Sequence, residues 1–157
     1  MHLITGDETG LVRFISTDKK DFVTYGETQS RMKSVLSMQW LIPNETFALL
    51  RANGDIETYV ISLDDSGNGA LELTGVTKSN IISPIKLTKM NENSIFCYNS
   101  IGEVEIISFS EERGCLDQSS SLFGGDNCLR GPADAVVYND VSSRLACGGQ
   151  KNDLQVT

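Results

Sequence analysis

A 14-residue frame occurs four times in the chain, and each copy has the pattern of a β-hairpin. The copies read LITGDETGLVRFIS from Leu3, FALLRANGDIETYV from Phe47, IFCYNSIGEVEIIS from Ile95 and, one residue shorter, LACGGQKNDLQVT from Leu145. In each copy, two apolar stretches flank a polar turn that holds Gly10, Gly54, Gly102 or Asn152. This turn position requires a positive φ, which glycine adopts freely and asparagine tolerates well. The frame therefore predicts four β-hairpins.

The spacing of the turn residues indicates how the hairpins are organised. Successive turn residues lie 44, 48 and 50 residues apart, and the blades of β-propellers repeat about every 40–50 residues. Apolar stretches suited to further strands precede the later hairpins at 34–42, 85–90 and 133–138, and others follow the first three at 22–25, 70–74 and 115–122. A strand, a hairpin and a strand form the four-stranded meander of one blade. No helical periodicity competes with this pattern.

The predicted fold is therefore all-β, a partial propeller of about three and a half four-stranded antiparallel blades. All 157 residues are assigned to one domain. We expect blades at 1–25, without its inner strand, at 34–75, at 82–122 and at 133–157, which stops before its outer strand. Closed propellers usually have about 4–8 blades. The chain is thus expected to be the N-terminal part of a longer ring.

Composition narrows the function classes. The formal charge of −8 disfavours sequence-independent wrapping of nucleic acid, which needs clustered Lys and Arg, and favours basic protein partners. No apolar run approaches the ~20 residues of a membrane helix, and no signal peptide is expected. The four cysteines show no zinc-binding spacing. These features predict a soluble intracellular protein with reduced thiols and no membrane partner.

The sequence contains no arrangement of residues that predicts catalysis. Gly148-Gly149-Gln150-Lys151 lacks the spacing of a phosphate-binding loop and is expected to be a strand end and turn. Cys147 has no base to activate it, because His2 is the only histidine. Adjacent carboxylates, as in Asp64-Asp65, do not face each other across a substrate. We predict a protein that is not an enzyme, with no catalytic, cofactor-binding or metal-binding residues and no small-molecule substrate.

Binding residues are expected where the hairpin turns meet the connections between blades. That face is mixed in charge, whereas the opposite face leans acidic. The candidate partner-binding residues are Arg31, Arg51, Asn53, Lys151 and Asn152. Turn formation is the stronger interpretation for Asn53 and Asn152. Trp40 is either an exposed interaction anchor or, as we favour, part of the packed interior of its blade.

The fourth copy, LACGGQKNDLQVT, resembles the strand-turn-strand of WD repeats. The resemblance is incomplete, since no copy ends in Trp-Asp and no connection carries Gly-His. The usual His-Ser/Thr-Asp-Trp network is therefore not expected, and the blades should depend more on apolar packing. The succession LLRANGDIETYVIS, FCYNSIGEVEII and GPADAVVYNDVSSRLACGGQKNDLQVT resembles the nucleolar WD-repeat factors of large-subunit ribosome assembly.

This resemblance implies the N-terminal part of a seven-bladed WD40-like propeller that acts as a scaffold in the nucleolus. It implies binding to assembly factors and ribosomal proteins on pre-60S particles, contact with pre-rRNA, and release by an AAA-ATPase. The family has no catalytic residues or cofactors to transfer. One alternative is a generic WD-repeat adaptor of another intracellular complex, and a propeller hydrolase has little support.

Overall fold

The chain consists of strands, turns and connecting loops, with no helix among the residues that the structure describes. This computed structural model describes residues 2–16, 21–25, 34–66, 69–123, 133–139, 141–142, 144–149 and 154–156. The strands are β1 (His2–Gly6), β2 (Val12–Ser16), β3 (Asp21–Tyr25), β4 (Val35–Ile42), β5 (Thr46–Arg51), β6 (Asp55–Leu63), β7 (Gly69–Lys78), β8 (Pro84–Asn91), β9 (Ser94–Asn99), β10 (Val104–Ser110), β11 (Cys115–Phe123), β12 (Ala133–Asn139), β13 (Arg144–Gly149) and β14 (Leu154–Val156). The all-β prediction is confirmed.

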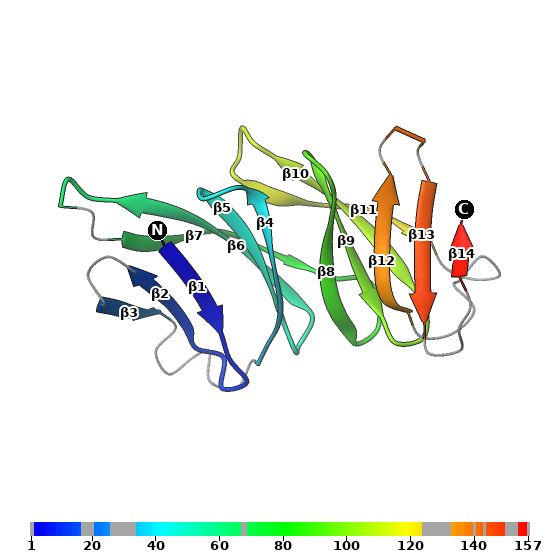
Figure 1. Cartoon of the computed structure of the whole chain (residues 1–157), viewed down its shortest axis with the longest axis horizontal. Coiled ribbons are helices and arrows are strands. Elements are labelled where there is room, and N and C mark those ends of the chain that lie inside the picture. Colours follow the sequence, from blue (N-terminus) through cyan, green and yellow to red (C-terminus); the bar gives the residue numbers. More distant parts are fainter. Residues whose placement is uncertain are drawn as a thin grey trace.

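Four antiparallel sheets follow one another in the order of the sequence (Figure 1). They have the strand orders β1-β2-β3, β4-β5-β6-β7, β8-β9-β10-β11 and β12-β13-β14. This arrangement is compatible with a β-propeller-like fold. The second sheet continues to Lys78, three residues beyond the boundary expected at 75.

Each copy of the sequence frame forms the predicted hairpin, as β1–β2, β5–β6, β9–β10 and β13–β14. The φ angles of Gly10, Gly54 and Gly102 are 85°, 84° and 95°, so the expected positive φ is confirmed in three turns. Asn152, in the fourth turn, lies outside the described residues. Positions within the frame are numbered below from Leu3, Phe47 and Ile95 as position 1.

The second strand of each complete sheet is the most deeply buried, because both of its faces contact another sheet. All six residues of β5 are buried. Phe47 and Leu49 pack towards the first sheet, in a cluster with Val12 and Ile4. The intervening side chains point to the other face, as the two-residue period of a strand requires.

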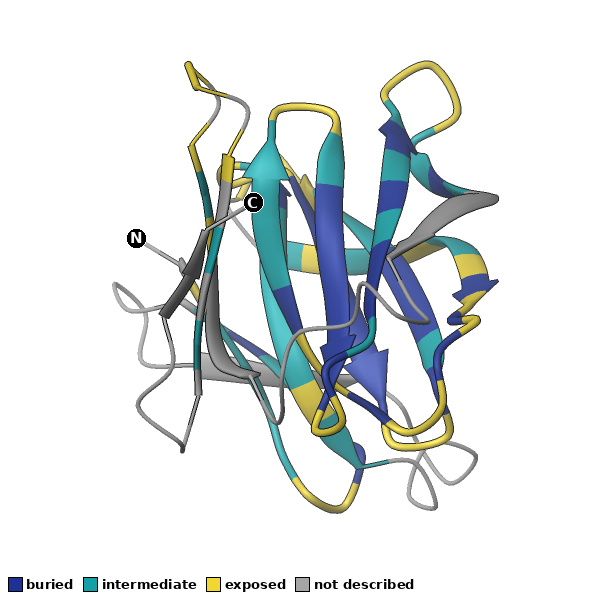
Figure 2. Ribbon diagram, turned by 90° about the vertical axis from the view of Figure 1, so that its right-hand side faces the viewer, coloured by how far each residue is buried: buried dark blue, intermediate teal, exposed yellow. Residues whose placement is uncertain are grey.

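The same alternation continues into the third sheet. Ala48 and Leu50 share the largest apolar cluster with Ile95 and Cys97 of β9. Phe96 lies on the opposite face of β9. Its ring contacts the ring of Tyr138 in β12, with a centroid distance of 5.9 Å. Figure 2 shows this buried interior in the middle strands, with exposed residues concentrated in the turns. Each large apolar side chain buried in this way stabilises the fold by about 1.5–3 kcal/mol.

The described hairpin turns, β1–β2, β5–β6 and β9–β10, lie towards the lower edge of Figure 1, and we name this side the hairpin-turn face. Backbone hydrogen bonds join the two kinds of segment. Val35 N donates to Asp7 O at 3.0 Å, and Ser79 N donates to Gly54 O at 2.9 Å. At these two junctions, the chain that enters the next sheet is therefore hydrogen-bonded to the turn of the preceding hairpin.

The first strand of each of the last three sheets has an irregular register near this face. The shifts lie between Val35 and Ser37, between Pro84 and Lys86, and between Ala133 and Ala135. Such a bulge turns a side chain away from its regular direction. In β4 and β8 the extra residues are Leu36 and Ile85, which are 43% and 39% exposed.

Candidate partner-binding face

Only two of the five predicted binding residues belong to the described part of the chain. Arg31, Lys151 and Asn152 lie outside it, so their role stays a prediction. Arg51 and Asn53 occur in the same hairpin, two residues apart. Their environments differ, because Arg51 is buried and Asn53 is exposed.

Asn53 is exposed and shapes its own turn. Its Oδ1 accepts a hydrogen bond from Asp55 N at 3.1 Å, and its Nδ2 donates to Asp55 Oδ2 at 2.6 Å. Lys78 Nζ donates to the carbonyl oxygen of Asn53 and to Asp55 Oδ1, the latter at 3.1 Å. The side-chain atoms of Asn53 thus stabilise the turn, which agrees with the prediction that Asn53 is a turn-forming residue.

Arg51 is fully buried, with a relative exposure of 0%. Its Nε and Nη2 donate to Glu57 Oε2 at 3.0 and 2.8 Å, and Tyr59 OH donates to the same oxygen at 2.8 Å. Its Nη1 donates to Gly10 O at 2.6 Å, which ties the second hairpin to the first. The expectation that Arg51 lies on an exposed rim is therefore wrong. A buried guanidinium needs charged and polar partners. Its own hairpin supplies the carboxylate of Glu57, and the neighbouring hairpin supplies the carbonyl of Gly10.

Asp7 occupies the same position of the frame as Arg51. Its Oδ1 accepts hydrogen bonds from Thr9 Oγ1 at 2.6 Å, Thr9 N at 2.9 Å and Leu11 N at 3.1 Å. Its Oδ2 accepts one from Arg13 Nη1 at 2.8 Å. The Thr9 hydroxyl first, then Arg13 and the two backbone amides, lower the pKa of Asp7 from 3.8 to about 2.

Asn99 fills the equivalent place in the third hairpin and is 1% exposed. Its Oδ1 accepts hydrogen bonds from Ile101 N at 3.2 Å and Glu103 N at 3.0 Å. Its Nδ2 donates to Glu103 Oε2 at 2.5 Å and to Ile82 O at 2.8 Å. One neutral side chain thus holds both the hairpin turn and the connection that precedes the third sheet.

Glu105, at position 11 of the frame, is also 1% exposed. Its Oε2 accepts hydrogen bonds from Ser79 Oγ at 2.7 Å and Asn80 N at 3.0 Å, and its Oε1 accepts one from Asn80 Nδ2 at 2.6 Å. Ser79 Oγ also lies 3.7 Å from Cys97 Sγ. Burial raises the pKa of the Cys97 thiol to about 12, which makes it a poor nucleophile.

Polar clusters at positions 5 and 11 of the frame therefore occupy the ends of the first three hairpins. The comparison of copies in the sequence did not predict them. The available signal was the pairing of opposite charges at these two positions, as Asp7 with Arg13 and Arg51 with Glu57. The sheets consequently combine apolar packing with side-chain hydrogen bonds that differ from the WD network.

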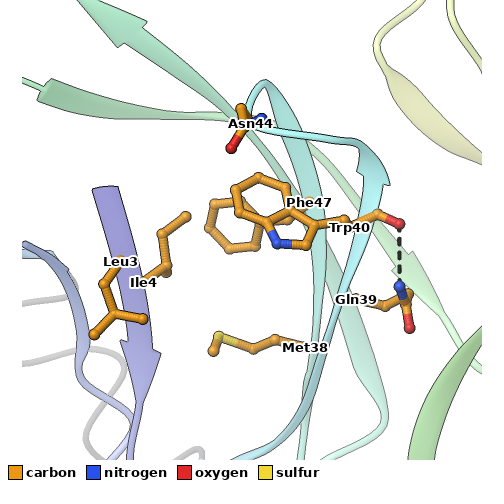
Figure 3. A pocket seen from close by; sticks show the side chains of 7 residues that line it. All are labelled: Leu3, Ile4, Met38, Gln39, Trp40, Asn44 and Phe47. Atoms are coloured by element: carbon orange, nitrogen blue, oxygen red, sulfur yellow. Dashed lines mark hydrogen bonds between the residues drawn. The ribbon is translucent and has the colours of Figure 1, made fainter. Parts of the chain in front are cut away.

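A partly open pocket of about 390 Å³ lies between β1 and β4, away from these polar clusters. Figure 3 shows Ile4, Met38, Trp40 and Phe47 around it. The Trp40 ring meets Phe47 edge-on, with a centroid distance of 5.8 Å. Trp40 is half-buried, so it packs in the sheet and also reaches the pocket.

No group of three or more His, Cys, Asp or Glu residues that could hold a metal ion occurs among the described residues. The same part of the chain has no helix long and apolar enough to cross a membrane. The clusters of Asp7, Asn99 and Glu105 instead use their hydrogen bonds to fix turns and connections.

No protein-family model matches the sequence, and no curated protein matches it. Among solved structures, the fold is similar to the crystal structure of Sqt1 from Chaetomium thermophilum, with a TM-score of 0.65 and 14% sequence identity. The match covers 93% of this chain and 35% of the Sqt1 chain. The chain thus spans about a third of that structure, and at this identity the likeness concerns the fold alone.

Proposed function

We propose that the chain is the N-terminal part of a seven-bladed WD40-like propeller that acts as a non-enzymatic scaffold in assembly of the large ribosomal subunit. The scaffold binds assembly factors and ribosomal proteins on nucleolar pre-60S particles, contacts pre-rRNA within the particle, and is released by an AAA-ATPase. The observation that carries the proposal is the series of four antiparallel sheets whose hairpins coincide with the repeated frame.

The likeness to Sqt1 supports the propeller part of this proposal, because similar sheets extend over 93% of the present chain. The ribosomal part is supported by the sequence resemblance to nucleolar WD-repeat factors. The formal charge of −8 supports direct binding to basic proteins. Because the chain is acidic overall, we assign the contact with rRNA to the basic candidate residues Arg31 and Lys151.

The free edge of β1 supports the proposal of a further strand in the ring. Within the described residues, β1 is the edge of its sheet. Leu3 and Ile4 of this strand line the pocket between β1 and β4. An additional strand paired with β1 would satisfy this edge and cover the half-exposed Leu3.

The decisive experiment is purification of the tagged full-length protein, followed by identification of its associated proteins and RNA. The proposal expects large-subunit assembly factors and pre-rRNA to co-sediment with the protein in pre-60S fractions. A different stable complex that lacks both would favour the generic WD-repeat adaptor and exclude the ribosomal role.

A second experiment tests the basic residues. Charge reversal by Arg31→Glu together with Lys151→Glu should reduce co-sedimentation with pre-60S particles, because contacts with phosphates depend on Lys and Arg. Arg31→Lys together with Lys151→Arg is the matched control, because it keeps both positive charges. Unchanged association of a folded charge-reversed protein would remove these two residues from the binding face.

A further inference from the structure

The turn between β5 and β6 contains an Asn-Gly pair, Asn53-Gly54. Asn-Gly is the dipeptide most prone to spontaneous deamidation, because glycine has no Cβ to shield its backbone nitrogen from the preceding side-chain amide. Asn53 is exposed to water, which the reaction consumes. The sequence has a second Asn-Gly pair, Asn68-Gly69, but Asn68 lies outside the described residues. The surrounding contacts are therefore defined for Asn53-Gly54.

Deamidation of this pair proceeds in two balanced steps. The nitrogen of Gly54 attacks Cγ of Asn53, a C–N bond forms, and Nδ2 leaves as ammonia, which takes the proton of the Gly54 amide. Water then opens the cyclic imide. Cleavage at Cγ gives aspartate, whereas cleavage at the main-chain carbonyl carbon gives isoaspartate, in which the backbone is one CH₂ group longer.

The groups that react in the first step are held by hydrogen bonds in the folded turn. Gly54 N donates to Arg51 O at 2.9 Å. Asn53 Nδ2 donates to Asp55 Oδ2 at 2.6 Å, and Asn53 Oδ1 accepts a bond from Asp55 N at 3.1 Å. Ammonia cannot leave while Nδ2 is bound to the Asp55 carboxylate, and hydrogen bonds to charged groups are among the stronger ones. The folded turn therefore opposes the reaction.

Lys78 of β7 covers the same turn. Its Nζ donates to Asn53 O and to Asp55 Oδ1, the latter at 3.1 Å. A Cβ placed on Gly54 would lie 3.7 Å from Lys78 Cε and 3.7 Å from Pro84 Cγ. Gly54 is accordingly buried, although Asn53 beside it is exposed. Lys78 thus positions the Asp55 carboxylate and shields the peptide bond that would react.

The products of deamidation would not fit these contacts. Aspartate at position 53 has no donor for Asp55 Oδ2, so two carboxylates would face each other and share Lys78. Isoaspartate would lengthen the backbone next to Gly54, whose carbonyl accepts a hydrogen bond from Ser79 N at 2.9 Å. Either product would weaken the junction between this turn and the connection to the third sheet.

We propose that Asn53 is a deamidation site that Asp55 and Lys78 hold unreactive in the folded turn. Loss of their contacts permits an irreversible change, in which ammonia is released, the chain gains one negative charge and the junction at Ser79 loosens. The inference is independent of the proposed function, because it depends only on the chemistry of this turn.

Timed incubation of the full-length protein at neutral pH tests the inference. Mass spectrometry of proteolytic peptides, with fragmentation to separate position 53 from position 68, measures the rate at Asn53. Asp55→Ala should raise this rate about tenfold, because the hydrogen bond to Nδ2 is lost. Lys78→Ala should raise it less, since Lys78 contacts the backbone of Asn53 and not its amide. The matched control is Glu92→Ala, which removes an exposed carboxylate from the β8–β9 turn and should leave the rate unchanged.

The same protein unfolded in urea gives the rate without the turn. We expect this rate to equal or exceed that of Asp55→Ala. Equal rates in the folded and unfolded native sequence would overturn the inference even where Asp55→Ala fails to fold. An Asp55→Ala variant that is folded by circular dichroism and reacts no faster than Glu92→Ala would also overturn it.

Hydrogen exchange tests the consequence for the junction. Asn53→Asp reproduces one product, and the amide of Ser79 should exchange about tenfold faster in this variant than in the native protein. Asn53→Ser is the matched neutral control, because serine also forms turns of this kind. Unchanged exchange at Ser79 in Asn53→Asp would reject the loosening of the junction.

Discussion

The first and second hairpins carry the same pair of frame positions with reversed charge. Positions 5 and 11 hold Asp7 and Arg13 in the first hairpin, and Arg51 and Glu57 in the second. Both pairs have an N–O distance of 2.8 Å. The side chains of the first pair are 36% and 30% exposed for Arg13 and Asp7, whereas Arg51 is 0% exposed and Glu57 11% exposed.

This difference in burial gives the two pairs different energetic roles. An exposed ion pair is screened by water and contributes little to stability. A buried pair carries a large desolvation cost that its mutual attraction offsets, so loss of one partner leaves a charge without compensation. Arg51 additionally donates to Gly10 O of the first hairpin. The second pair therefore holds two sheets together, whereas the first pair shapes its own turn.

The largest expected effect is the loss of the buried cation. Arg51→Met leaves Glu57 buried without its cation and removes the hydrogen bond to Gly10 O. The free energy of unfolding should fall by about 3–5 kcal/mol. Urea unfolding of the full-length protein, followed by circular dichroism, measures this change, and Arg13→Met is the matched control at the exposed pair. Equal losses in the two variants would contradict the comparison.

The third hairpin provides a buried carboxylate, Glu105, that forms no ion pair among the residues the structure describes. Both carboxylate oxygens of Glu105 accept hydrogen bonds, from Ser79 and Asn80. Glu105→Gln replaces one of these oxygens by an NH₂ group, which is a donor and cannot accept the bond. We expect a loss of about 1–3 kcal/mol, since a buried polar group is left poorly paired. Alkylation of Cys97 gives an independent readout, because Ser79 lies beside this buried thiol. Faster alkylation is expected in the variant, and unchanged labelling together with unchanged stability would reject the role of Glu105.

Replacement of both charges in the second hairpin should recover much of the lost stability. In Arg51→Met with Glu57→Leu, no unpaired charge remains buried, and such apolar replacements are often close to neutral. Gly10 O and Tyr59 OH still lose their partners, so a deficit of about 1–2 kcal/mol should remain. A double variant as unstable as Arg51→Met alone would show that the contact with Gly10 outweighs the charge of Glu57.

The hairpins and sheets could be predicted because their signals are local. Glycine at the turn of the first three copies, asparagine in the fourth, and alternation along the strands mark every hairpin, and the observed pairing follows them. Arg51 was predicted to be exposed because the sequence pattern places it at the end of a strand. The pattern does not indicate which neighbouring segment buries its side chain. Its partner Gly10 O lies 41 residues away. The burial of Arg51 therefore depends on how the first and second sheets pack against each other.

The exposure of Ile82 and Ile101 could not be predicted for a related reason. Ile82 belongs to a connection between sheets, and its position depends on the hydrogen bond to Asn99 of another sheet. Ile101 occupies a turn position where the aligned copies carry Thr9 and Asn53, so its apolar character alone could have marked the third turn as unusual. Opposite charges at positions 5 and 11 could likewise have been noticed, since these residues are diagonal neighbours across a hairpin.

The smallest expected effect concerns the exposed pair and appears in a titration. The pKa of Asp7 is lowered to about 2, mainly by the Thr9 hydroxyl and to a lesser extent by Arg13. Thr9→Ala should therefore raise this pKa towards 3.8 more than Arg13→Ala does, as followed by NMR of the Asp7 carboxyl group. Because the folded pKa is below the unfolded value, the stabilisation by Asp7 is complete above pH 3.8 and is lost as the pH falls through about 2. A larger shift in Arg13→Ala would mean that the ion pair dominates at this hairpin too, and that the two hairpins differ only in depth.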